Sequence, residues 1–359
     1  MMRATKACLL VLCVVLTAGG CAKPIPTGPL MDPLSAGELG FTPQWAANLE
    51  VPPGMHLSHV VVLGDLVVTV ESPSNIVTAL SVRAGKEVWR RQVDESAVVL
   101  NKPFRIGDRL YINSPSQLYV LDVENGHELA RHGLESSVNR APAVFKDRVV
   151  YGAMNGLVFA QDLETGATLW RARLPGRIVA SPVAVGTSVL VADQQGEYAL
   201  MDSANGSVRW MGRTFGPITA TPAAGKQNIF IASEDQSLYA IAKRDGSEQW
   251  KYAAGQRLTK SPVKMSSIVM LPLPRGGTVV FDALRGTELW RNSLSMEPVV
   301  ASKGRVLVLA GRTLSFVERS TGARIVSAAV QPLQTVLSTG DGGIVLVSPR
   351  GRLLKLDRR

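Results

Sequence analysis

Side chains that could do chemistry are scarce in this chain of 359 residues, and their spacing does not form a catalytic set. The four histidines are His56, His59, His127 and His132. His56 and His59 have the spacing of some metal-binding pairs, but no acid or cysteine lies within five positions of either, which favours ordinary surface histidines. The chain also lacks a Gly-x-Ser-x-Gly motif and a phosphate-binding loop. We therefore predict no catalytic residue, no metal site and no cofactor, and we expect a protein that is not an enzyme.

The N-terminal residues have the features of a secretion signal. Arg3 and Lys6 precede an apolar run over residues 7–16, which is too short to span a bilayer. Small residues then lead to Cys21, and this pattern resembles the lipobox of bacterial lipoproteins. We expect a signal peptide over residues 1–20 and lipid attachment at Cys21, with ordinary cleavage as the alternative. Removal of the signal would leave Cys21 as the only remaining cysteine, so no disulfide is expected.

The residues after this cysteine are rich in proline and have little hydrophobic pattern. Prolines stand at positions 24, 26, 29 and 33. Such a composition is typical of an extended linker. We expect residues 21–41 to form a tether and residues 42–359 to form the folded domain.

A unit of about 40 residues is repeated along that domain. It is marked by seven glycines, which are 41, 40, 40, 40, 40 and 36 residues apart: Gly85, Gly126, Gly166, Gly206, Gly246, Gly286 and Gly322. A tryptophan follows four positions after five of them, as Trp89, Trp170, Trp210, Trp250 and Trp290. A fixed period of this length indicates one small structural unit copied many times.

Each unit has the pattern of four short strands. A proline stands about 24 residues before the glycine, as Pro103, Pro142, Pro182, Pro222, Pro262 and Pro298, and is expected to open the first strand. Short apolar runs broken by turn residues follow. The glycine closes the last hairpin because it accepts a positive φ without a Cβ clash. An acid four residues earlier, as at Asp122, Asp162, Asp202, Asp282 and Glu318, is expected to cap that turn.

Repeats of four antiparallel strands form the blades of a β-propeller. We predict an all-β, eight-bladed propeller, with seven blades as the alternative. The last repeat lacks an outer strand, and the strand around Trp45 lacks partners before it, so we expect this strand to complete the last blade and close the ring. The tryptophans are expected to fill the wedge between blades. Ala130 and Val326 replace tryptophan in the second and seventh units, so looser packing is expected there.

Basic residues gather in three connections between repeats. The net charge of the chain is +10, and the segments 171–181, 211–221 and 251–261 contain no acid. These connections should share one face of the ring. Arg177, Arg257 and Lys260 are candidate partner contacts on that face. An exported protein rarely meets nucleic acid, so an acidic protein surface, lipopolysaccharide phosphates or the membrane itself are better candidates.

The segment 162–170, with its copies at 202–210 and 282–290, resembles the repeat of quinoprotein-like propellers. That group includes enzymes that use pyrroloquinoline quinone and non-catalytic lipoproteins. Length, lipobox and closing strand are most similar to the BamB family. The resemblance implies a lipid-anchored scaffold on the periplasmic face of the outer membrane, which docks as a monomer on a BamA-like protein and assists unfolded outer-membrane proteins. By the same resemblance Leu174, Arg177, Ile178 and Phe215 are candidate contacts. Another envelope propeller that binds glycan or protein, or a quinone-dependent oxidoreductase, is the alternative.

Overall fold

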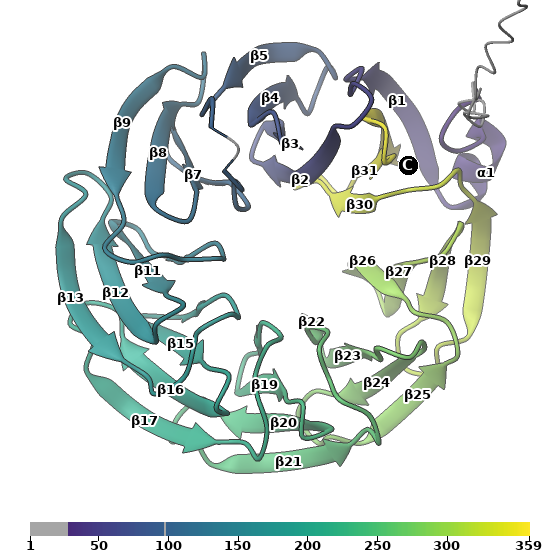
Figure 1. Cartoon of the computed structure of the whole chain (residues 1–359). Helices are drawn as coiled ribbons and strands as arrows, with labels where there is room; N and C mark the ends of the chain where they lie inside the picture. The colour runs from purple at the N-terminus through teal and green to yellow at the C-terminus, as the bar shows by residue number, and fades with distance from the viewer. Residues whose placement is uncertain (1–27, 97) are drawn as a thin grey trace, which may run out of the picture.

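The computed structural model of the chain describes residues 28–359 except Ala97. Over these residues, 32 strands form eight four-stranded antiparallel sheets arranged as a closed ring (Figure 1). The prediction of an eight-bladed propeller is confirmed, and the alternative of seven blades is wrong. The expected signal peptide, residues 1–20, and Cys21 lie outside the described residues.

We number the blades in chain order, and in each blade the first strand lies nearest the ring axis. The first four blades are β2 (His56–Leu63), β3 (Leu66–Ser72), β4 (Ile76–Ser81) and β5 (Glu87–Gln92); β6 (Phe104–Ile106), β7 (Arg109–Asn113), β8 (Gln117–Asp122) and β9 (Glu128–Gly133); β10 (Ala143–Val144), β11 (Arg148–Gly152), β12 (Leu157–Asp162) and β13 (Thr168–Arg173); β14 (Val183–Val185), β15 (Ser188–Ala192), β16 (Glu197–Asp202) and β17 (Val208–Arg213).

The last four blades continue this order and end with the closing strand. They are β18 (Ala223–Ala224), β19 (Asn228–Ala232), β20 (Ser237–Ala242) and β21 (Glu248–Ala253); β22 (Val263–Met265), β23 (Ile268–Pro272), β24 (Thr278–Asp282) and β25 (Glu288–Asn292); β26 (Glu297–Ser302), β27 (Arg305–Ala310), β28 (Thr313–Glu318) and β29 (Arg324–Ala329); β30 (Thr335–Ser338), β31 (Ile344–Val347), β32 (Arg352–Arg358) and β1 (Phe41–Asn48).

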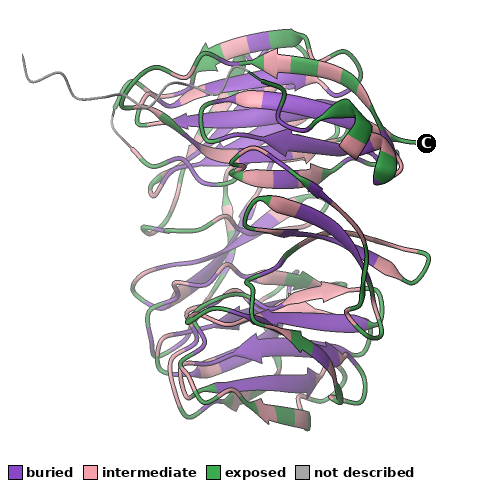
Figure 2. Cartoon of the chain, turned by 90° about the vertical axis from the view of Figure 1, so that its right-hand side faces the viewer, coloured by how far each residue is buried: buried purple, intermediate pink, exposed green. Residues whose placement is uncertain are grey.

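The residue types of each strand follow from its place in the blade. The two middle strands pack against a neighbouring blade on both faces and are almost wholly buried, as in β15 and β16. They are therefore nearly continuous apolar runs. Figure 2 shows such buried strands in purple inside the blades, with exposed and intermediate segments at their edges. The outer strands, such as β17, alternate between exposed and partly buried positions. Five of the six repeat prolines directly precede the first strand of their blade, and Pro298 is the second residue of β26, as expected.

The N-terminal strand closes the ring. β1 pairs antiparallel with β32, and Trp45 lies opposite Lys355. The last blade thus takes its outer strand from the start of the domain, and the sequence-based expectation for Trp45 is confirmed. This pairing joins the two ends of the folded chain without leaving an open sheet edge between the first and last blades.

The tryptophans join each blade to the next through the repeat glycines. Trp170 lies over Gly206 of the following blade, so closely that a Cβ built on this glycine would lie 2.5 Å from the Trp170 Cε3 atom. The same contact joins Trp45 to Gly85 and Trp290 to Gly322. In five such pairs the indole Nε1 also donates a hydrogen bond of 2.7–3.0 Å to a carbonyl of the next blade: Trp45 to Val82, Trp89 to Val123, Trp170 to Ser203, Trp210 to Lys243, and Trp290 to Arg319.

The glycines are therefore required for two reasons. Their φ angles of +67° to +76° are rarely adopted by other residues, as the sequence indicates. The absent side chain also leaves the space that the neighbouring indole occupies. The acids before them accept backbone N–H groups of the turn at Asp122, Asp162, Asp202 and Asp282, as expected, while Glu318 accepts the Thr321 hydroxyl at 2.6 Å.

The two junctions that lack a tryptophan are filled by other groups. Between blades two and three, the His132 ring lies over Gly166 and takes the place of the indole that Ala130 lacks. Between blades seven and eight, beside Val326, the segment before β1 packs into the seam. The expected loose packing at these positions is thus compensated by side chains from elsewhere.

That segment differs from the extended tether that the sequence predicts. It contains the helix α1 (Pro33–Glu38), whose N-cap Asp32 accepts a hydrogen bond from the Ser35 N–H at 3.0 Å. Leu30 and Met31 are 4% and 2% exposed, and Met31 forms a β-bridge with Val330 next to β29. Residues 30–39 are therefore part of the propeller, because four of their apolar side chains fill the space between blades seven and eight: Leu30, Met31, Ala36 and Leu39.

Replacing Gly206 by alanine tests the contact between blades. The new Cβ must displace the Trp170 ring and also adopt a positive φ, so we expect Gly206→Ala to lower the free energy of unfolding by about 2–4 kcal/mol. Gly186 is the matched control, because it has a φ of +63° but no atom within 4 Å of its Cβ position. Gly186→Ala should cost about 1 kcal/mol. Equal losses in guanidinium denaturation would contradict the contact.

Replacing Met31 by alanine tests whether the N-terminal segment belongs to the folded domain. Because Met31 is buried in the seam, Met31→Ala should lower the free energy of unfolding by about 2–5 kcal/mol. Leu34 of the same segment is 81% exposed, so Leu34→Ala should change stability by less than about 0.5 kcal/mol. A segment that behaves as a free tether would give no difference between the two variants.

Candidate protein-binding face

The connections between blades share one face of the ring with the turns between the second and third strands. Backbone hydrogen bonds hold the two sets together: the Gln194 N–H donates to the Arg177 carbonyl at 3.0 Å, and the Ile218 N–H donates to the Asp193 carbonyl at 3.0 Å. We call this surface the connection face. The opposite surface carries the turns between the first two strands and the repeat glycine turns, and we call it the turn face.

A buried apolar residue fixes each regular connection in place. Val138, Ile178, Ile218 and Leu258 occupy the same position in successive repeats and are at most 1% exposed. Ile178 packs directly on Gly152, and Leu174 is 3% exposed in the same core cluster. Leu174 and Ile178, which the resemblance suggested as partner contacts, are therefore core residues and present no side-chain surface to a partner.

Phe215 is the most exposed large apolar side chain of the described residues, at 90%. Its backbone does not move freely, because the Phe215 N–H donates to Asp235 Oδ2 at 3.0 Å. The Lys251 ammonium lies 5.4 Å from the centroid of the ring, and Met211, on the preceding strand, is 59% exposed. The connection face thus presents an aromatic ring on a fixed loop, which is a common feature of binding hot spots.

Two acids of this face, Asp193 and Asp235, bind backbone groups inside the loops. Asp193 is fully buried and accepts the N–H groups of Gly176, Gln195 and Glu197 at 2.7–2.9 Å. Asp235 accepts the N–H groups of Phe215 and Ser237. Each of these carboxylates is directed at backbone donors of its own turn and of the adjoining connection. They therefore stabilise the loops and contribute less negative potential to the outer surface.

The basic side chains of the same face are less fully compensated. Arg171 pairs with Glu135, and Arg213 lies 3.6 Å from Glu197. Arg257 is 78% exposed, with only a distant contact of 3.9 Å to Glu234. Arg177 and Lys260 are exposed, and neither makes an ion pair with a residue that the structure describes. Arg177, Arg257 and Lys260 therefore present positive charge on the connection face.

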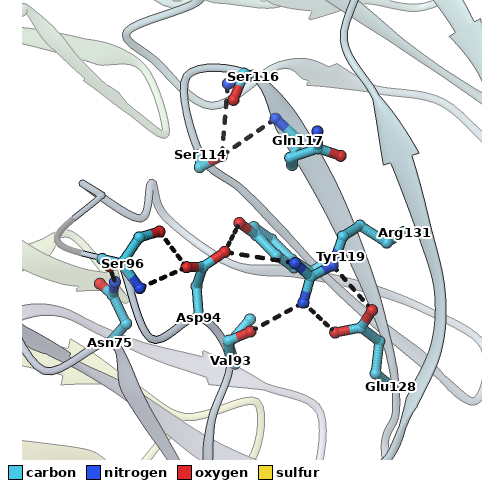
Figure 3. A network of polar contacts seen from close by, with 10 residues as sticks. All are labelled: Asn75, Val93, Asp94, Ser96, Ser114, Ser116, Gln117, Tyr119, Glu128 and Arg131. Atoms are coloured by element: carbon cyan, nitrogen blue, oxygen red, sulfur yellow. Dashed lines mark hydrogen bonds and ion pairs between the residues drawn. The ribbon is translucent and has the colours of Figure 1, made fainter.

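A polar network holds the first, longer connection of this face (Figure 3). The Tyr119 hydroxyl donates to Asp94 Oδ2 at 2.6 Å, and the Arg131 guanidinium lies 4.7 Å from the Tyr119 ring centroid. Arg131 also pairs with Asp94 at 3.5 Å and with Glu128 at 2.8 Å. The fifth blade repeats this arrangement, with the Tyr239 hydroxyl donating to Asp235 and Lys251 lying 4.6 Å from the Tyr239 ring. Both networks tie a connection or turn to an outer strand.

No group of three or more His, Cys, Asp or Glu side chains within residues 28–359, Ala97 apart, could hold a metal ion. His59 lies on the inner strand β2, and burial, followed by the charges of Lys102 and Arg140, lowers its pKa. The nearby positive charges of Lys102 and Arg140 would repel a metal cation, so His59 does not suit a metal site. Among the described residues, no helix has both the length and the apolar character needed to cross a membrane.

Sequence reasoning found the repeat but missed several residues that build this face. Asp193 is buried and Asp235 is half-buried, and both could have been noticed, because they lie in the turn between the second and third strands of their blades, where an acid can accept backbone N–H groups. The stacking of each tryptophan on the next glycine had a weaker signal, because only three of the six pairs share the same offset of 36 residues. His132 gave no signal at all, because it lies two positions after the residue that it replaces.

A family model described as outer membrane protein assembly factor BamB matches the chain in overlapping segments over residues 42–150, 73–174, 114–202 and 154–359. No curated protein matches the chain. Among solved structures, BamB from Moraxella catarrhalis is similar with a TM-score of 0.71 at 20% identity, covering 89% of this chain and 98% of that one.

Two other solved structures share the fold. The computationally designed Ika8 protein has a TM-score of 0.70 at 16% identity, over 87% of this chain and 98% of that chain. The quinohemoprotein alcohol dehydrogenase ADHIIG from Pseudomonas putida HK5 has a TM-score of 0.68 at 12% identity, over 90% of this chain and 77% of that chain. At these identities the likeness concerns the fold alone.

The network around Asp94 predicts a pH-dependent contribution to stability. Hydrogen bonds from the Ser96 and Tyr119 hydroxyls hold the pKa of Asp94 below its ordinary value. The stabilisation is therefore complete above the pKa of the unfolded carboxyl, about 4, and is lost as the pH falls toward the folded pKa. We expect Asp94→Asn to cost about 1–3 kcal/mol at pH 7.

This cost should shrink when thermal unfolding is followed below pH 4 or so. The exposed neighbour Glu95 is the control, and Glu95→Gln should leave the melting temperature unchanged at both pH values. A loss for Asp94→Asn that is the same at pH 7 and at about pH 3 would mean that the ionised carboxylate does not stabilise the fold.

Proposed function

The chain belongs to the family of outer membrane protein assembly factor BamB, and we propose that it is a non-catalytic scaffold for β-barrel assembly at the outer membrane. The observation that carries the proposal is the match of that family over residues 42–359, which include all eight blades and the closing strand. In this proposal the protein acts by binding other proteins and catalyses no reaction.

The connection face is the proposed docking surface. It combines a fixed, exposed Phe215 with exposed cations at Arg177, Arg257 and Lys260. An aromatic anchor and positive charge on the same face suit a protein partner whose surface has an apolar pocket and acidic residues around it. In this family's setting, that partner is a BamA-like assembly protein, and unfolded outer-membrane proteins are the further cargo.

Lipid attachment at Cys21 would hold the propeller at the periplasmic side of the outer membrane. The described chain begins seven residues after this cysteine, at Gly28, and Leu30 and Met31 are already buried in the seam between blades seven and eight. The tether is therefore short, so the anchored propeller stays near the membrane surface and has a restricted orientation. Such a restriction favours a partner that is itself embedded in the membrane.

Substitutions on the connection face test the docking. A serine at position 215 removes the aromatic anchor without affecting the core, so Phe215→Ser should weaken binding of the BamA-like partner more than about tenfold. Leu129→Ser is the matched control, because Leu129 is 53% exposed but lies at the start of β9, near the turn face. Affinity should be measured with the purified, detergent-solubilised proteins.

Charge reversal tests the electrostatic part of the same surface. Arg177→Glu should slow association and weaken binding, with the larger effect at low salt. Lys303→Glu, in the exposed turn between β26 and β27 of the turn face, is its control. If the native protein is recovered from solubilised envelopes only with proteins unrelated to barrel assembly, the proposed function is wrong.

A further inference from the structure

A pocket of about 540 Å³ opens on the turn face between blades five and six. Three turns surround it: residues 225–228 after β18, Ser266 and Ser267 after β22, and residues 282–285 after β24. Phe230 lines the pocket beside them. It lies on the opposite side of the ring from the proposed docking surface and is not part of that site.

Positive charge dominates the lining of this pocket. Lys226, Lys264 and Arg285 line it, and none of them makes an ion pair with a residue within the described ranges. Burial, and then the charge of Lys243, lowers the pKa of Lys264, which indicates that a fourth cation is near. The one carboxylate in the lining is Asp282, and its Oδ1 accepts the N–H groups of residues 284 and 285.

A related position in the same molecule shows what is missing. On β6, Arg105 forms an ion pair of 2.5 Å with Asp65 in the turn of the preceding blade. Lys264 occupies the equivalent register on β22, opposite Val269 as Arg105 is opposite Leu110. The turn position equivalent to Asp65 is Gln227, which carries no charge. The fold can therefore place a counter-ion next to this cation, and at Lys264 it does not.

The seam beneath the pocket also departs from the repeat. Trp250 is the indole of this junction, yet its Nε1 is buried without a hydrogen-bond partner among the described residues. The carbonyl that corresponds to its usual acceptor is that of Ala283, and this carbonyl accepts from Asn228 Nδ2 at 3.3 Å instead. Asn228 and Ala283 both line the pocket. The Trp250 junction thus lacks the indole hydrogen bond that the other tryptophan junctions make, and it lies beside the cations of the pocket.

We propose that this pocket binds a phosphorylated anion. Three cations against one carboxylate leave an excess of two positive charges, which matches a phosphate dianion. Ser266, Ser267 and Gln227 supply neutral hydrogen-bond donors around the lysines, and Phe230 with the exposed Leu284 forms an apolar wall for the rest of the ligand. A free phosphate compound and a phospholipid headgroup share this chemistry.

Calorimetric titration of the full-length, detergent-solubilised chain tests the proposal. The probes are inorganic phosphate, pyrophosphate and a short-chain phosphatidic acid, each at constant ionic strength. We expect saturable binding of at least one probe, and a loss of affinity of about tenfold or more in Lys264→Gln, because a charged hydrogen bond is removed. Tighter binding of phosphatidic acid points to a lipid headgroup, and tighter binding of the inorganic anions points to a soluble ligand.

Two further variants separate binding from folding. Gln227→Asp rebuilds the counter-ion seen at Asp65, so it should weaken binding about as much as Lys264→Gln while leaving the melting temperature unchanged or raised. Lys146→Gln, at the turn position of blade three that corresponds to Lys226, should bind like the wild type. The proposal is overturned if no probe binds saturably, or if the three variants bind with equal affinity.

Discussion

The contact between an indole and a glycine of the next blade is the constraint on which this ring depends. Each tryptophan fills the wedge that opens toward the rim between two twisted sheets, and the missing Cβ of the glycine lets the ring approach within van der Waals distance. The burial of about 150–250 Å² of aromatic surface at about 25 cal/mol per Å² is worth about 4–6 kcal/mol as an upper value. Repeated around the ring, this contact sets the angle between blades, and the β1–β32 pairing closes it.

The departures from this contact locate the individual features of the protein. His132 fills one seam, the segment with Met31 fills another, and Trp250 remains in its seam without its usual hydrogen bond. Identical repeats would form identical contacts between all neighbouring blades. Where a repeat lacks the tryptophan or its hydrogen bond, another group must fill the space between the blades, or the space stays open. Two of the three differences involve packing alone, and the third coincides with a charged pocket. The connection face is a separate region, where the exposed side chains of Phe215, Arg177 and Lys260 lie on loops whose N–H groups are bound by Asp193 and Asp235.

The fold could be predicted from the sequence because its signal is repeated: seven glycines, six prolines and five tryptophans in register specify strands, blades and closure. The site could be predicted only in part. Phe215, Arg177, Arg257 and Lys260 are exposed on the expected face, but Leu174 and Ile178 are buried, because alternation along a short connection does not tell which side chain meets the next blade. The packing of Met31, the substitution of His132 for tryptophan and the missing counter-ion of Lys264 all depend on residues at least 34 positions apart in the sequence, which one sequence does not reveal.

The propeller is a frame that presents different chemistry on its two faces. The most direct measurement is site-specific photo-crosslinking in intact cells, with a photoreactive residue at position 215 of the connection face or at position 303 of the turn face. We expect position 215 to crosslink to a membrane-embedded barrel-assembly protein and position 303 not to do so. A crosslink to that protein from position 303 alone, or from neither position, would contradict the assignment of the docking face.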